Sequence, residues 1–210
     1  ISALQMGRDL DVQYKTAFVL THKIRESLMA QRDASPLAGE IHMDGAYVNG
    51  HIRPANKKED RVDRRLVVNQ RPNKRCVFVM RQKVNVIGDA IRGANKTISF
   101  VIKAENQADV NKLAEAFVEK GSVICTDESV GYDGLHAKFD TRRVNHSIEY
   151  RSAAGVTNNM AESYFSRFRR MQYGQTHKFG NEYLANYANE AAYREDTRRQ
   201  PNGTIFMDIV

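Results

Sequence analysis

The sequence predicts an α/β protein in which a mixed sheet with flanking helices follows a small helical unit. Three observations support this fold class. The chain has 210 residues, 41% of them apolar, which is enough to bury a core. Strand-like apolar runs occur in its middle part, and segments with helical periodicity lie at both ends and between the later strands. A stretch with Pro36 and Gly39 separates the helical start from the first strand, which indicates two structural units.

The first unit, residues 1–30, is predicted to form two helices joined by a short turn. Ser2 caps the first helix, and the second helix has apolar residues at helical spacing. The second helix is also basic, and Lys15 and Lys23 lie on its polar sides. The unit therefore resembles a DNA-binding helix-turn-helix, and the alternative is an ordinary helical hairpin that packs on the next domain. Residues 31–39 form the linker to that domain.

The second unit, residues 40–199, begins with a strand, and residues 200–210 are predicted to be a tail. The order of elements is strand, strand, strand, helix, strand, short helix, strand-like segment, helix. This is the order of a ribonuclease-H-like fold, a mixed sheet with helices on both sides. The predicted strands are 40–48, 75–80, 97–102 and 122–126, with a strand-like segment at 143–150, and the predicted helices are 107–120, 132–139, 158–173 and 181–197.

The charge of the chain favours a polyanionic partner. Lys and Arg number 32 against 25 Asp and Glu, which gives a net charge of +7. Such a balance is typical of proteins that bind nucleic acid. Residues 51–75 hold nine basic and three acidic residues, among them Arg64 and Arg65, and form either a solvated face or a track for a DNA backbone. No apolar run approaches the roughly 18 residues that span a bilayer, so we expect no membrane partner and a cytoplasmic protein.

Three acidic residues occupy informative places in this order of elements. Asp44 lies in the first strand, Asp127 ends the fourth strand, and Glu162 lies in a late helix. Two aspartates on strands and one glutamate on a helix can converge on a point, as a pair of Mg²⁺ or Mn²⁺ ions with oxygen ligands requires. Gly45 and Ala46 are small, and we expect them to leave room for a metal and a phosphate.

Two further residues are alternative ligands at this site. Glu128 follows the strand-end aspartate directly, so that either carboxylate could point into the site. Asn158 lies on the same helical stripe as Glu162. The stripe continues to Arg169, and with the neighbouring Arg170 it would place positive charge beside a phosphate.

The cysteines do not indicate a metal site. Cys76 and Cys125 are the only two, and each lies within an apolar strand-like run. No CxxC or HxxxH spacing is present, so the sequence does not encode a zinc finger or ribbon. We interpret both cysteines as buried small apolar residues.

Taken in order, these residues resemble a known family. The chain is similar to bacterial insertion-sequence transposases of the ISXO-two-like group, which belong to the DDE superfamily. The similarity extends from the helix-turn-helix-like segment to about residue 199. Its main blocks are MDGAYV at 43–48, RRLVVNQ at 64–70, TDE at 126–128, LHAKF at 135–139, VNHS at 144–147, TNNMAESYFSR at 157–167 and EAAYRED at 190–196.

The resemblance implies a function. Asp44, Asp127 and Glu162 would be the catalytic triad of a DNA transposase that uses two Mg²⁺ or Mn²⁺ ions to cleave DNA and transfer strands. Its partners would be double-stranded DNA, both transposon terminal repeats and target DNA, and paired ends favour a homo-oligomer at the bacterial nucleoid.

Three departures from the family pattern leave alternatives open. Many members have Glu-Thr where this chain has Gly45-Ala46, a lysine where it has Arg169, and a cysteine zinc ribbon ahead of the helical unit. One alternative is an inactive or repurposed transposase that only binds DNA. Another is a ribonuclease-H-like nuclease that hydrolyses strands without joining them.

Overall fold

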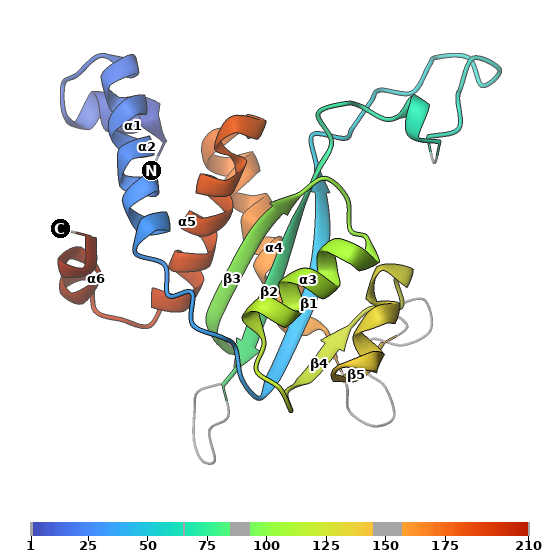
Figure 1. Ribbon diagram of the computed structural model, residues 1–210. Helices are drawn as coiled ribbons and strands as arrows, with labels where there is room; N and C mark the ends of the chain where they lie inside the picture. Colours follow the sequence, from blue (N-terminus) through green and yellow to red (C-terminus); the bar gives the residue numbers. More distant parts are fainter. Residues whose placement is uncertain (1, 65, 85–92, 145–156, 210) are drawn as a thin grey trace.

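The computed structural model describes residues 2–64, 66–84, 93–144 and 157–209. Its centre is a five-stranded sheet in the order β3-β2-β1-β4-β5 (Figure 1). β1, β2 and β3 are antiparallel neighbours, whereas β4 runs parallel to β1 and β5 runs parallel to β4. The predicted ribonuclease-H-like fold class is confirmed. The strands are β1 (Glu40–Val48), β2 (Arg75–Lys83), β3 (Ala94–Ile102), β4 (Val123–Thr126) and β5 (Asp140–Arg143).

Helices cover both faces of the sheet and bury a separate core on each (Figure 1). α3 (Gln107–Phe117) packs on one face, where β1 contributes Met43 to the core. α4 (Asn159–Met171) and α5 (Leu184–Thr197) cover the other face, where β1 contributes Ala46. Because side chains alternate along a strand, the even-numbered residues of β1 face α4 and α5.

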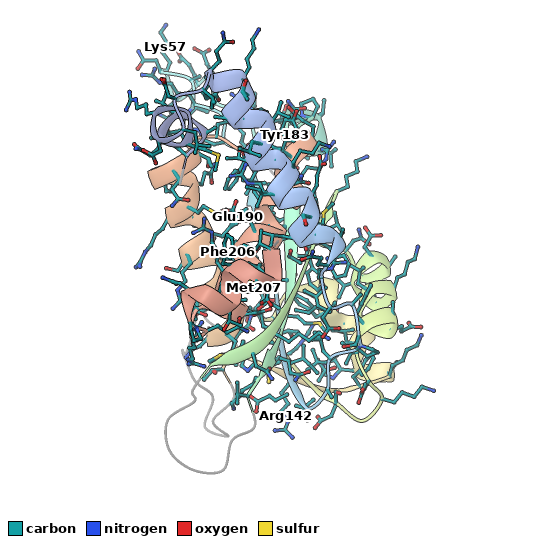
Figure 2. All side chains as sticks on the ribbon, turned by 90° about the vertical axis from the view of Figure 1, so that its left-hand side faces the viewer. Lys57, Arg142, Tyr183, Glu190, Phe206 and Met207 are labelled. Carbon is teal, nitrogen blue, oxygen red and sulfur yellow. The ribbon has the colours of Figure 1, made fainter. Side chains whose placement is uncertain are left out.

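The N-terminal helices form the predicted hairpin. α1 (Ala3–Asp9) is capped by the Ser2 side chain, which accepts a hydrogen bond from the backbone of residue 5, and α2 (Tyr14–Ala30) follows a short turn. α2 packs along α5, as Figure 2 shows around the labelled Glu190. Arg25 Nε donates a hydrogen bond of 2.7 Å to Glu190 Oε2, and both side chains are buried. The hairpin is therefore anchored to the sheet domain, and its contact with DNA stays a prediction.

Some boundaries differ from the predicted ones. α3 ends at Phe117, three residues before the predicted end, because the linker before β1 bonds to the backbone at the end of this helix. The N–H of Leu37 donates to the carbonyl of Phe117 at 2.7 Å, and Leu37 forms a parallel bridge with Val118. β5 begins at Asp140, earlier than predicted, and positions 145–150 of the predicted strand-like segment lie outside the described residues.

Short helices complete the described chain. The predicted helix at 132–139 is a 3-10 helix two residues earlier, η2 (Val130–Ala137). The predicted tail contains a helix, α6 (Asn202–Ile209), near α2. The other turns are η1 (Val67–Asn69), η3 (Gln172–Thr176) and η4 (Asn181–Tyr183).

Residues 49–74 between β1 and β2 form an arm that extends away from the sheet (Figure 1). Within it, Val67 and Val68 are 84% and 86% exposed, so the described part of the arm has no core at its tip. Elsewhere Cys76 and Cys125 are buried and unpaired, as the sequence predicts. Among the residues that the structure describes, no helix is long and apolar enough to cross a membrane.

Candidate active site

Asp44 and Asp127 come from two neighbouring parallel strands. Asp44 lies in β1 opposite Val79 of β2, on the face that α4 covers. The parallel register places His42 beside Cys125. Asp44 lies two residues beyond His42, and Asp127 lies two residues beyond Cys125. Since side chains repeat every second residue along a strand, this register directs both carboxylates to the same face of the sheet.

The N-terminal turn of α4 brings two more oxygen-bearing side chains to this face. Asn158, at the N-cap, is 1% exposed, and its Nδ2 donates a hydrogen bond of 3.1 Å to the carbonyl of Met43. Its Oδ1 is buried and has no hydrogen-bond partner among the described residues. Glu162 lies one turn further, with its backbone N–H donating to the carbonyl of Asn158 at 3.2 Å. α4 is thus attached to β1 directly beside Asp44.

The surroundings of Asp44 are strongly negative. Burial is the largest cause that raises the pKa of Asp44, to about 7, and the charges of Glu105, Asp127 and Glu162 raise it further. The N–H of Gly45 opposes this shift through a hydrogen bond of 2.8 Å to Oδ1. The charges of the other two predicted acids therefore act on Asp44. Such a group of carboxylates attracts cations.

Glu105 is a further acid whose charge raises the pKa of Asp44, and the sequence analysis missed it. We expected small residues after Asp44 to leave room for a metal and a phosphate, and at Gly45 this expectation is wrong. The Glu105 carboxyl group fills the space over Gly45, since a Cβ there would lie 2.7 Å from Glu105 Cδ. Ala46 is buried in the core beneath α4. The one available signal was an acid between the third strand and the next helix.

Of the two adjacent acids after β4, Asp127 is the better placed. Asp127 is half-buried, and its Oδ1 accepts a hydrogen bond of 2.9 Å from the backbone of Ser129. Glu128 is exposed. The charge of Asp127 also raises the pKa of Asp44. Glu128 and Asn158 remain alternative ligands, and Asn158 has the stronger case because of its buried, unpartnered oxygen.

Two of the predicted DNA-contacting arginines meet in one groove. Arg64 of the arm and Arg169 of α4 line a groove of about 360 Å³, together with Lys74 and Tyr173. The Arg64 guanidinium donates to the carbonyl of Ile52 at 2.8 Å, which holds it against the base of the arm. The fold therefore brings together positive side chains that are more than a hundred positions apart in the sequence.

The other predicted DNA contacts are scattered. Lys15 and Lys23 are exposed on α2, and Lys23 Nζ lies 2.8 Å from Glu26 Oε2. Arg170 is exposed on α4 and lines a different pocket, together with Arg167 and Arg194. Arg65 lies outside the described residues.

A second cluster of possible metal-binding side chains lies on β1 and β4, beginning two residues before Asp44 and Asp127. Glu40, His42 and Cys125 each offer a ligand atom, and these atoms lie within 4.8 Å of one another. The carboxylate of Glu40 is already paired with Lys83 Nζ, at 2.8 Å from both oxygens. Burial raises the pKa of the Cys125 thiol to about 11. A nitrogen and sulfur set suits zinc rather than magnesium, so the oxygen-bearing side chains around Asp44 are the better candidates for a magnesium-type site.

A ribonuclease-H-like sheet with acids on β1, after β4 and on α4 defines the class: a nucleic-acid-processing domain with a candidate cation site. A family model described as the ISXO2-like transposase domain matches residues 36–196, and the chain belongs to this family. No curated protein matches the sequence. Membership in this DDE transposase family implies a DNA substrate and the use of divalent metal ions.

Proposed function

We propose that this protein is a DDE transposase that cleaves DNA at insertion-sequence ends and transfers the freed strand to target DNA. One observation carries the proposal: Asp44 is half-buried and other carboxylates raise its pKa, while Asn158, which has an unpartnered Oδ1, bonds to the carbonyl of the preceding residue, Met43. Carboxylate and amide oxygens are the hard donors that Mg²⁺ and Mn²⁺ prefer. In this proposal Asp44, Asp127 and Glu162 hold the cations, with Asn158 as an additional oxygen ligand.

The chain's residues would serve two successive reactions at this site. First, water attacks the phosphodiester at the transposon end and leaves a free 3′-hydroxyl. Second, that hydroxyl attacks a phosphodiester of the target, a new 3′–5′ bond forms, and a target 3′-oxygen leaves. Divalent cations at the site lower the pKa of the attacking group and stabilise the leaving oxyanion. Asp44, with its raised pKa, must release its proton to act as a ligand.

The position of each ligand suits this work. Asp44 lies in the central strand of the sheet, where its backbone pairs with Val79 of β2, and β4 pairs with β1 up to His42, two residues earlier. Glu162 is exposed on α4, where it can reach a cation from the solvent side that DNA occupies. The nearby groove with Arg64, Lys74 and Arg169 would bind the phosphates of the DNA backbone.

A strand-joining assay tests the proposal. Purified protein is incubated with supercoiled target plasmid and labelled, pre-cut transposon-end DNA, with and without Mg²⁺ or Mn²⁺. We expect metal-dependent joined product, reduced about 100-fold or more in Asp127→Asn because one cation ligand is lost. Glu119→Gln is the matched control, since it neutralises an exposed glutamate beyond α3, and it should join DNA at the wild-type rate.

The other outcomes identify the alternatives. Metal-dependent nicking without joined product would indicate a ribonuclease-H-like nuclease. Salt-sensitive DNA binding with neither nicking nor joining would indicate an inactive transposase that retains only DNA binding. Equal activity of Asp127→Asn and the wild type would contradict the assignment of the metal ligands.

A further inference from the structure

The Glu105 carboxylate lies against the strand that carries Asp44. A Cβ at Gly45 would lie 2.7 Å from Glu105 Cδ and 2.8 Å from both of its carboxylate oxygens. No side chain at position 45 fits while this carboxylate stays in place. Gly45 directly follows Asp44, and its Cβ direction is that of the α3 face, so the Glu105 carboxyl group reaches β1 from the side opposite the Asp44 side chain. Its charge is nevertheless close enough to raise the pKa of Asp44.

Contacts from two other elements hold Glu105 in this position. The hydroxyl of Tyr132 in η2, a fully buried side chain, donates a hydrogen bond to Glu105 Oε1. The backbone N–H of Glu105 donates to the hydroxyl of Tyr47 in β1 at 3.1 Å. Gly131 lets η2 approach, since a Cβ there would lie 3.1 Å from the Glu105 carbonyl oxygen. Because hydrogen bonds hold both its backbone and its carboxylate, the position of Glu105 is determined by its contacts with β1 and η2.

The charges around Glu105 lack compensation. Glu105 is the largest of the three charged causes that raise the pKa of Asp44. Burial, followed by the charge of Asp127, raises the pKa of Glu105 itself. Among the described residues, every charged side chain that shifts these two pKa values is an acid. Placing a further carboxylate here costs free energy, and a divalent cation would offset that cost.

We propose that Glu105 is a fourth carboxylate ligand of the cation site, directed into it by Tyr132 and admitted by the missing side chain of Gly45. This inference rests on the proposed function, because it assumes that Asp44 and Asp127 hold divalent cations. The independent sign that this site takes a ligand is the buried, unpartnered Oδ1 of Asn158, which is bonded through Nδ2 to the residue before Asp44.

Cation binding to the purified protein tests this role without relying on activity. Mn²⁺ affinity is measured by titration calorimetry for the wild type, Glu105→Gln, Asp127→Asn and the control Glu119→Gln, an exposed glutamate beyond α3. Glutamine keeps an oxygen for the Tyr132 hydroxyl but lacks the charge. We expect Glu105→Gln to weaken Mn²⁺ binding about tenfold or more. The control should bind as the wild type does.

Thermal unfolding separates a ligand from a structural residue. In EDTA, Glu105→Gln should have a Tm equal to or above that of the wild type, since it removes a like charge from a crowded site. In Mn²⁺, the rise in Tm should be smaller than for the wild type, because less cation is bound at a given concentration. A lower Tm in EDTA with a full rise in Mn²⁺ would show a structural role and overturn the proposal.

Moving the carboxylate to position 45 gives a second, independent test. In a glutamate, Cδ lies roughly 2.5 Å from its own Cβ, given carbon–carbon bonds of about 1.5 Å. A glutamate at position 45 can therefore place its carboxyl carbon near the site of Glu105 Cδ, 2.7 Å from the Cβ position. Gly45→Glu combined with Glu105→Ala should recover most of the Mn²⁺ affinity that Glu105→Ala alone loses. Failure of this double variant to bind better than Glu105→Ala would contradict the proposed position.

The panel distinguishes this inference from the proposed function. If Asp127→Asn loses Mn²⁺ affinity and Glu105→Gln does not, the cation site stands and Glu105 is not a ligand. If neither variant loses affinity, the metal ligands of the proposed function are wrong, and the Glu105 inference falls with them.

Discussion

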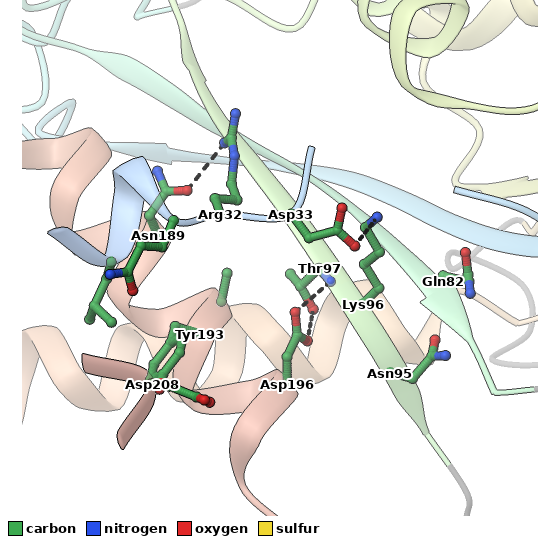
Figure 3. Close-up of a pocket in the computed structure, with 13 residues that line it drawn as sticks. Arg32, Asp33, Gln82, Asn95, Lys96, Thr97, Asn189, Tyr193, Asp196 and Asp208 are labelled. Atoms are coloured by element: carbon green, nitrogen blue, oxygen red, sulfur yellow. Dashed lines mark hydrogen bonds and ion pairs between the residues drawn. The ribbon is translucent and has the colours of Figure 1, made fainter. Parts of the chain in front are cut away.

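At the scale of single residues, burial decides the protonation of Asp196 in α5. Burial is the largest influence on this carboxyl group and raises its pKa from 3.8 to about 6. Its two oxygens accept hydrogen bonds of 2.7 Å from the backbone N–H and the hydroxyl of Thr97, which oppose the shift. Figure 3 shows these bonds at the wall of a pocket of about 560 Å³. The folded state therefore holds a proton on Asp196 more tightly than the unfolded state does.

This difference predicts a pH dependence of stability. Because the folded pKa exceeds the unfolded value, the contribution of Asp196 is complete below pH 3.8 and is lost as the pH rises through about 6. Asp196→Asn stays neutral, so its free energy of unfolding should rise relative to that of the wild type across this window, by about 3 kcal/mol for a pKa difference of about two units. Urea unfolding at several pH values measures the difference. Asp208→Asn, an exposed residue of the same pocket, is the control and should show no such gain.

A site residue can be predicted from the sequence where it belongs to one strand-like segment. It cannot be predicted where its position depends on contacts with segments that are distant in the sequence. Asp44 and Asp127 are recognisable because each lies in or directly after a strand-like segment with buried residues. Glu105 has no such mark, because its place depends on a glycine 60 positions earlier and a tyrosine 27 positions later, a combination that only the fold assembles. Sequence periodicity reports burial of neighbours along the chain and carries no information on such contacts.

At the scale of elements, a buried arginine connects the sheet to the helix that carries Glu162. Arg81 of β2 is 0% exposed. Its guanidinium donates to the hydroxyl of Ser163 at 2.8 Å and to the carbonyl of Met160 at 2.6 Å, both in α4. It also donates to Glu195 Oε2 of α5 at 3.1 Å. One side chain thus fixes β2, α4 and α5 in relation to one another.

Removal of this guanidinium should destabilise the fold. Arg81→Met keeps much of the volume but leaves buried acceptors without their donor, so we expect a loss of about 3 kcal/mol in the free energy of unfolding. Arg81→Lys should recover only part of this, because an ammonium group cannot reproduce the planar set of bonds. The exposed Arg170→Met is the control and should cost less than about 0.5 kcal/mol. Urea unfolding decides the matter, and equal losses for Arg81→Met and the control would refute the structural role of Arg81.

Element prediction was most accurate for one strand, β1, and two helices, α4 and α5. β1 agrees with its predicted limits, and α4 and α5 lie within theirs, since a long apolar pattern bounded by polar residues defines each. The end of α3 was wrong because the linker residue Leu37, distant in sequence, bonds to its last turn. α6 was missed because eight residues with one glycine carry little helical periodicity.

At the scale of the whole molecule, the fold places a candidate DNA-binding groove on one face of the sheet and α3 on the other. The groove formed by Arg64, Lys74 and Arg169 lies between the arm and α4, on the face of the sheet that also holds the acids. α3 covers the opposite face (Figure 1). Both sides carry exposed cations, so net charge alone does not show where a duplex would bind. The position of the acids does, because a phosphodiester at the site brings its neighbouring phosphates onto the α4 side.

This asymmetry predicts which cations contribute to DNA affinity. The double variant Arg169→Ala/Arg170→Ala on α4 should reduce the slope of log affinity against log salt concentration by nearly two, at about 0.9 per lost phosphate contact on duplex DNA. The control, Lys112→Ala/Lys120→Ala, removes two exposed cations from α3 and the segment after it, and should leave the slope unchanged. Fluorescence anisotropy of a labelled duplex between about 50 and 200 mM salt gives both slopes. Equal reductions in the two double variants would mean that the duplex binds through net charge alone, without the path across α4 that the site requires.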